Sequence, residues 1–191
     1  MSHYSEDIKR AVFKSCLSCV QTTLKDGTRI NVRPLKPSDK RYLIEMYSTI
    51  SPYTQNLRFG CVKSIDGWRA VNIGRSVIYI DGTDVDYDTS MSLVAVKEIH
   101  NGIKIVGDAR YVLNKEKNEA ECTLLVHDDY HNLGLGTQLM GCLIDVARKR
   151  NISKIYACIA AKNKKMLHVA RKTGFEVIHK DSDEYIMKID L

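Results

Sequence analysis

The sequence predicts an α/β domain with a central mixed, mostly antiparallel sheet flanked by helices. Three strand-like runs follow one another directly in the middle of the chain, at 91–99, 103–113 and 119–126. Asn101-Gly102, between the first two runs, is a strong hairpin signal. A strand–helix–strand–helix–strand order follows from 119 onwards, and this combination indicates a mixed sheet with helices packed on its faces.

The part of the chain before residue 90 holds predicted elements of both kinds. They are a helix over 5–20 with Ser5 as N-cap, a strand within 26–35, a helix over 36–50 with Ser38 as N-cap, and a short helix over 51–60. Residues 64–85 mix helical and strand periods, so no element is assigned there.

The part after residue 126 alternates helices and strands. We expect a helix over 135–150, a strand over 154–161, a helix over 162–174, a strand near 175–180 and a last strand over 184–191. The helix over 135–150 carries its apolar side chains on one face, which anchors it on the sheet; they are Leu135, Leu139, Cys142, Leu143 and Val146.

Composition favours an ordinary globular protein without a membrane partner. The chain has 191 residues, of which 44% are hydrophobic and 27% charged. No apolar run approaches the roughly 20 residues that span a bilayer, and no signal-peptide core is present. We therefore expect an intracellular, cytoplasmic protein. Cys16 and Cys19 have no second pair at zinc-site spacing, so we expect reduced, structural cysteines and no metal.

The positive charge is concentrated near the C-terminal helices. The whole chain has a net charge of +6, and the window 140–175 holds nine lysines or arginines and a single acid, Asp145. Such a region attracts anions, which leaves nucleic acid or a small polyanionic ligand as partners. Basic residues interleaved with aromatic residues are lacking, so we do not expect nucleic acid.

Gly134 and Gly136 stand where the predicted strand 119–126 gives way to a helix. A helix N-terminus presents unpaired N–H groups, and glycines let a phosphate approach the backbone. The glycines could alternatively serve only a tight strand-to-helix turn. A dinucleotide site would need a third glycine where Leu139 stands, and a P-loop would need a lysine that is absent, so both nucleotide interpretations fail.

The motif from His131 to Gly136 resembles the signature [QR]-x-x-G-x-[GA] of the GNAT superfamily of acyl-coenzyme A N-acetyltransferases. It departs at its first position, where His131 replaces Gln or Arg. The segment "AKNKKMLHVARKTGFEV" also resembles the family, with Asn163 and the Gly174-Phe175 pair in place. The resemblance implies the GNAT fold and acetyl-CoA as co-substrate.

Five further segments narrow the resemblance to the acetyltransferase domain of Pat-type protein lysine acetyltransferases. They are "LKDGTRINVRPLKPSDK", "NLRF", "DYDTSMSLVAV", "GDARYVL" and "AECTLLVHDDYHNLGLGTQLM". The similarity runs from about Thr23 to the C-terminus, with a poor patch over 64–85. It implies an acetyltransferase domain over 23–191, preceded by an N-terminal helical extension over 1–22.

By this resemblance, backbone N–H groups of the glycine turn hold the coenzyme A pyrophosphate, and Val126 offers its backbone to the pantetheine arm. The implied cofactor-binding residues are Val126, His131, Asn132, Leu133, Gly134, Leu135, Gly136, Thr137 and Asn163. The tyrosine that many members use to protonate the leaving thiolate is replaced by Ala170. We therefore expect solvent to supply that proton.

Acyl transfer to an amine also needs a base, because a lysine amine has a pKa of about 10.4. In the strand 119–126, alternation places Glu119, Glu121, Thr123 and Leu125 on one face. Glu121 is a mid-strand acid with little structural reason to be there, and it matches the catalytic glutamate of Pat-type enzymes. We expect it to be the general base, and Glu119, nearer the turn, to be an exposed acid.

The sequence thus predicts an acetyl-CoA-dependent N-acetyltransferase that acts by direct attack, with a primary amine as acceptor. The resemblance implies that this amine is a protein lysine. A small amine or polyamine acceptor, or a coenzyme A-binding regulatory module without turnover, are the alternatives. The sequence leaves open whether the protein is a monomer or a homo-oligomer.

Overall fold

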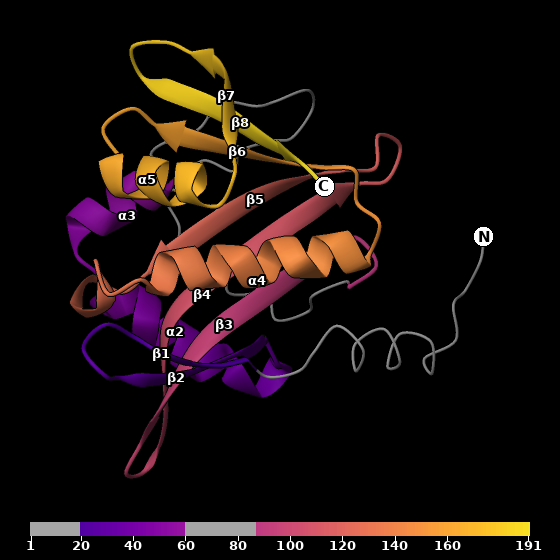
Figure 1. Ribbon diagram of the computed structural model, residues 1–191. Coiled ribbons are helices and arrows are strands. Elements are labelled where there is room, and N and C mark those ends of the chain that lie inside the picture. The colour runs from indigo at the N-terminus through magenta and orange to yellow at the C-terminus, as the bar shows by residue number, and fades with distance from the viewer. Residues whose placement is uncertain (1–19, 60–86) are drawn as a thin grey trace.

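A computed structural model describes residues 20–59 and 87–191 of the chain, and these form one mixed sheet with helices on both faces (Figure 1). The eight strands of the described part lie in the order β1-β2-β3-β4-β5-β6-β8-β7. They are β1 (Val20–Thr23), β2 (Arg29–Pro34), β3 (Ser90–Ile99), β4 (Gly102–Asn114), β5 (Glu119–Val126), β6 (Lys154–Ala160), β7 (Glu176–Lys180) and β8 (Glu184–Asp190).

Helices cover the two faces of the sheet separately (Figure 1). The described α-helices are α2 (Lys40–Thr49), α3 (Pro52–Phe59), α4 (Leu135–Lys149) and α5 (Lys164–Lys172). A short 3-10 turn, η1 (Pro37–Asp39), leads from β2 into α2, and another, η4 (Asp128–Tyr130), follows β5. α4 and α5 pack on one face, and α2 and α3 lie on the other. Each face therefore has its own layer of side chains.

The larger core lies between the sheet and α4. Leu135, Leu139 and Leu143 are fully buried there, together with Met140, Ile144, Val146 and Ala147 of the same helix. Cys142 is half-buried at the edge of this cluster. The apolar face predicted from helical spacing is thus confirmed, and it extends further round the helix because α5 packs beside α4.

The smaller core lies under α2. Leu43 and Met46 of α2 pack against Val94 and Ile105 of the two central strands and Leu125 of β5. Alternation along β5 decides this division: Leu125 faces α2, whereas Ala120 and Cys122 belong to the α4 core. The face that carries Glu121, Thr123 and Leu125 is therefore the α2–α3 face of the sheet.

The predicted fold class is confirmed, and the predicted strands and helices of the described part are present. The hairpin at Asn101-Gly102 is confirmed, with Ile99 paired to Gly102. The structure differs from the prediction at Val20, which was expected at the end of a helix. Val20 begins strand β1 and pairs with Val32. The rest of the expected N-terminal helix, Cys16 and Cys19, and the residues 64–85 lie outside the described residues.

The expected N-cap of the second helix is wrong. Ser38 lies inside the 3-10 turn η1, and the residue that precedes α2 is Asp39. The Asp39 carboxylate accepts hydrogen bonds from the Lys36 N–H at 2.8 Å and from the Arg33 guanidinium at 2.6 and 2.8 Å. The ion pair between Asp39 and Arg33 of β2 thus fixes this turn. The spacing of residues in the sequence does not indicate that Arg33 would be the partner of Asp39.

Candidate active site

The parallel strands β5 and β6 are paired over only part of their lengths. Their register runs from Glu119–Lys154 to Glu121–Tyr156 and ends there, although β5 continues to Val126 and β6 to Ala160. Beyond Glu121 and Tyr156, two neighbouring strands therefore carry backbone groups that do not pair with each other. The two strands diverge beyond this pair (Figure 1), and we call the space between their C-terminal ends the β5–β6 gap.

A pocket of about 450 Å³ lies at the open end of this gap. Four parts of the chain supply its described walls: the β1–β2 loop, α3, the end of β5 with the turn into α4, and α5 with the residue before it. The described lining residues are Lys25, Thr54, Leu57, Arg58, Leu124, Leu125, Val126, Tyr130, His131, Asn132, Gly134, Gly136, Thr137, Asn163, Lys164, Lys165, Met166, His168, Val169 and Lys172.

The glycine turn forms one wall of the pocket. Gly134 is the N-cap of α4 and has φ +93°, a left-handed conformation that favours glycine. A Cβ on Gly136 would meet Val169 Cγ2 at 3.3 Å and Leu124 Cδ2 at 3.4 Å, between β5 and α5. The first backbone N–H groups of α4 therefore reach the pocket without a side chain in the way, which suits a bound phosphate.

His131 ties the glycine turn to its neighbours on both sides. Its Nε2 lies 2.9 Å from the Val126 carbonyl oxygen, and its Nδ1 lies 3.0 Å from Lys165 Nζ. A carbonyl only accepts and an ammonium only donates, so Nε2 carries the proton and Nδ1 is the acceptor. His131 therefore closes the turn onto the end of β5 and holds a lysine of α5 at the pocket rim.

Val126 presents its backbone to the gap. The next residue, His127, donates its N–H to the Val106 carbonyl of β4 at 2.9 Å. Backbone groups alternate in direction along a strand, so the peptide groups of Val126 point away from β4, towards the pocket. The carbonyl bonds to His131, and the N–H faces the space in which an extended ligand would lie.

Asn163 caps α5 and lines the same pocket. Its Oδ1 accepts a hydrogen bond from the Met166 N–H at 3.1 Å, so the side chain stabilises the first turn of the helix. Of the described lining residues, five are lysine or arginine and none is acidic; the cations are Lys25, Arg58, Lys164, Lys165 and Lys172. The donor set and the open glycine turn fit the phosphates of coenzyme A.

Glu121 lies at the apex of the gap, in the last paired position with Tyr156. It is half-buried on the α2–α3 face and is not among the residues that line the pocket. Burial raises the pKa of its carboxyl, and the nearby Arg58 charge offsets this in part. Within the described residues no hydrogen bond or ion pair holds this carboxylate. Glu119, by contrast, pairs with Lys154 at 3.1 Å.

Arg58 is a site residue that the sequence interpretation did not single out. It lies on α3, lines the pocket, and donates from Nη2 to Thr123 Oγ1 at 2.9 Å. Thr123 shares the face of Glu121, two residues further along β5. The segment "NLRF" contains Arg58, but only the docking of α3 against β5 shows that its guanidinium reaches the neighbourhood of Glu121.

The described cysteines fit structural roles. Burial raises the pKa of the Cys122 thiol to about 12, so a thiolate nucleophile is strongly disfavoured there. Cys158 Sγ donates to the Glu184 carboxylate at 3.3 Å on the far side of β6 from the α4 core. Ala170 of α5 is fully buried, and its methyl group has no proton to give to a leaving thiolate.

The fold and the cleft together define an α/β protein with a site suited to an acyl-coenzyme A. A model of the acetyltransferase (GNAT) family matches residues 73–175. Acetyltransferase PA5475 of Pseudomonas aeruginosa is 32% identical over 164 residues, which cover 85% of this chain and 82% of that protein. The chain therefore belongs to the GNAT family and is an acetyl-CoA-dependent N-acetyltransferase whose acceptor is an amine.

Solved structures share the fold. The GNAT domain of S. lividans PAT gives a TM-score of 0.74 at 22% identity, covering 90% of this chain and 96% of that domain. Spermidine N-acetyltransferase of Vibrio cholerae, in complex with CoA and spermine, gives a TM-score of 0.61 at 16% identity, covering 84% of this chain and 95% of that one. Among the described residues no cluster of His, Cys, Asp and Glu could hold a metal, and no helix could cross a membrane.

Proposed function

We propose that this enzyme acetylates a lysine ε-amine on a protein, with Glu121 as general base. The observation that carries the proposal is the position of Glu121 at the apex of the β5–β6 gap. A ligand held by its phosphates at the glycine turn and extended along β5 would bring its far end towards this apex. The pocket residues supply the binding, and Glu121 supplies the proton acceptor.

In the proposed arrangement the chain's own groups divide the work. The N–H groups that open α4 would receive the pyrophosphate, with Lys165 held close by His131. The Val126 N–H would bond the amide arm. Acetyl-CoA supplies the thioester-activated acetyl group when it is bound. Because acetyl-CoA is an intracellular metabolite, we place the reaction in the cytoplasm.

Glu121 is suited to accept the proton that the acceptor must lose. A carboxylate with a raised pKa is a stronger base than an exposed glutamate, and it attracts the ammonium form of the incoming amine. The ammonium first loses a proton to Glu121, directly or through a water. The neutral amine nitrogen then forms a bond to the acyl carbon as the carbon–sulfur bond breaks. The second nitrogen proton is released to solvent, and solvent protonates the departing thiolate.

A lysine on a protein is the acceptor that we propose. It presents a single positive charge, which the Glu121 carboxylate alone can receive. The resemblance of five sequence segments to Pat-type enzymes and the fold likeness to the GNAT domain of S. lividans PAT also support this acceptor.

The test is mass spectrometry after incubation of the enzyme with acetyl-CoA and, in separate arms, lysate proteins, free lysine and spermidine. We expect acetylated lysines within proteins and little product from the two small amines. Spermidine as the main product would overturn the acceptor. Binding of acetyl-CoA without any acetylated product in all three arms would instead identify a binding module.

A further inference from the structure

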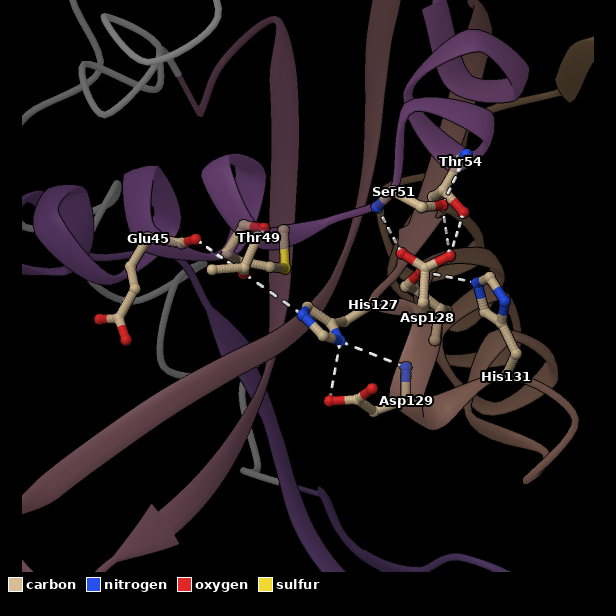
Figure 2. A network of polar contacts seen from close by, with 10 residues as sticks. Glu45, Thr49, Ser51, Thr54, His127, Asp128, Asp129 and His131 are labelled. Atoms are coloured by element: carbon tan, nitrogen blue, oxygen red, sulfur yellow. Dashed lines mark hydrogen bonds and ion pairs between the residues drawn. The ribbon is translucent and has the colours of Figure 1, made fainter.

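Asp128 lies in the short turn between β5 and the glycine motif, and its carboxylate reaches across to α3 (Figure 2). One oxygen accepts the Ser51 N–H at 2.8 Å. The other accepts the Ser51 hydroxyl at 2.8 Å and the Thr54 hydroxyl at 2.6 Å. These contacts join segments that lie 74 to 77 residues apart in the chain. We call this set of contacts the Asp128 clasp.

The clasp holds the N-terminus of α3. Ser51 precedes the helix, and its hydroxyl also accepts the Thr54 N–H at 3.2 Å, as an N-cap residue does. A negative charge at this end of the helix complements the unpaired N–H groups and the helix dipole. Thr54 is buried, so its hydroxyl depends on the carboxylate as its partner.

α3 connects the Asp128 clasp with the neighbourhood of the proposed base, Glu121. Thr54 and Arg58, one helical turn apart, both line the pocket. Arg58 donates to Thr123 at 2.9 Å, on the sheet face of Glu121. The charge of Arg58 also lowers the pKa of Glu121, against the effect of burial. The position of α3 therefore bears on the base, although Asp128 lies near the other end of β5.

We propose that Asp128 is a positioning residue, which fixes the first turn of α3 so that Arg58 stays over Thr123 and next to Glu121. This inference rests on the proposed role of Glu121 as base. In this proposal the Asp128 carboxylate links the turn before the glycine motif to α3, and through Arg58 of α3 to Glu121, which receives the acceptor amine. Asp128 itself touches neither the reacting atoms nor the glycine N–H groups.

Other charges near Glu121 are fixed by partners on the sheet. Among the described residues, the charged and titratable groups on the elements around it include Arg58 of α3, Asp108 and Arg110 of β4, Glu119 and Cys122 of β5, and Lys154 and Tyr156 of β6. Glu119 and Lys154 pair with each other at 3.1 Å, and Arg110 pairs with Asp108 at 2.8 Å. Arg58 is therefore the cation that a shift of α3 would move.

The clasp persists at every pH at which the enzyme would work. Burial would raise the pKa of Asp128, but the hydrogen bonds from Thr54 and Ser51, with His131 nearby, outweigh it and lower the pKa to about 2. Asp128 thus stays ionised well below neutral pH. Its effect on Glu121 must be tested by substitution, not by titrating Asp128 itself.

The experiment follows the titration of the Glu121 carboxyl carbon by NMR in the full chain, with the signal assigned from Glu121→Gln. We expect Asp128→Asn, Thr54→Val and Arg58→Gln each to raise the titration midpoint of Glu121. The matched control is Asp129→Asn, which makes the same charge change in the same turn but at an exposed side chain that pairs with His127. It should leave the midpoint unchanged, and Thr54→Ser should restore the wild-type value.

Where acetyl transfer is measurable, the fall in rate at acidic pH should shift together with the titration midpoint of Glu121. A move of one pH unit upwards lowers the rate on the acid side by about tenfold. The proposal is overturned if the titration midpoint of Glu121 is unchanged in folded Asp128→Asn or Thr54→Val protein. It is also overturned if Arg58→Gln leaves that midpoint unchanged. The NMR titration needs no turnover, so failure of the proposed acetyl transfer would show separately, as a wild-type enzyme that is inactive with every acceptor.

Discussion

Glu121 and Tyr156 form the last pair of the parallel β5–β6 ladder, and beyond them the two strands separate. This relationship places an acid with a raised pKa at the apex of the gap whose open end holds the glycine turn. One strand thus carries the proposed base near its middle and the proposed cofactor contacts at its C-terminal end.

Gly136→Val should abolish tight acetyl-CoA binding. Even a Cβ at this position meets Val169 at 3.3 Å and Leu124 at 3.4 Å, so a branched side chain would have to occupy the pocket. We expect the dissociation constant to rise by at least about tenfold, or about 1.4 kcal/mol, by calorimetry. Gly141→Ala is the matched control on the same helix, because a Cβ there meets nothing within 4 Å. Equal affinities in both variants would contradict the assigned cradle.

His131→Gln should keep acetyl-CoA binding, whereas His131→Ala should weaken it. A glutamine amide can donate to the Val126 carbonyl and accept from Lys165, as the imidazole does at 2.9 and 3.0 Å. Alanine loses both contacts and frees Lys165, so we expect about a five- to tenfold higher dissociation constant, near 1 kcal/mol. Measured affinity that falls equally in both variants would mean that His131 acts through something other than these two bonds.

The pH dependence of turnover should report Glu121. A base works only when deprotonated, and burial raises the pKa of this carboxyl above the ordinary value of 4.5. The kcat at saturating acceptor should therefore fall as the pH drops through that raised pKa. In Glu121→Gln this limb should vanish from any residual activity. A limb that persists unchanged in the variant would belong to another group.

Glu121→Gln should stabilise the folded protein at neutral pH. In the folded state the pKa of Glu121 is raised, so the ionised carboxylate is disfavoured relative to the unfolded chain, and this penalty is present at pH values above the folded pKa. Removing it should raise the Tm at pH 7. The gain should disappear well below the ordinary pKa of 4.5, where Glu121 is protonated in both states. Glu119→Gln, which loses the Lys154 pair, should show no such gain in calorimetry.

Local patterns in the sequence predicted which face of β5 carries Glu121 and where α4 begins. Alternation along 119–126 placed Glu121 and Thr123 on one face, and the structure keeps them there because the two faces bury different cores. The glycines marked the start of α4 at Leu135 because a left-handed N-cap such as Gly134 favours glycine.

Long-range contacts account for what the sequence did not reveal. Arg58 reaches Thr123 across 65 residues, and Asp128 reaches Ser51 across 77. The residue that precedes α2 is Asp39 and not the predicted Ser38, because Arg33 on β2 binds the Asp39 carboxylate. The β5–β6 pairing ends at Glu121 and Tyr156, and no local periodicity in the sequence indicates where two strands part.

The central claim is that Glu121 takes the proton of the acceptor, and the most direct measurement compares acetyl transfer by the wild type, Glu121→Gln and Glu119→Gln at equal acetyl-CoA occupancy. Thiol release with an acetylated protein acceptor identified by mass spectrometry provides the assay. We predict that Glu121→Gln binds acetyl-CoA normally and loses about 10²- to 10⁴-fold in kcat, while Glu119→Gln stays close to the wild type. Wild-type turnover in a folded, acetyl-CoA-binding Glu121→Gln enzyme would contradict the claim.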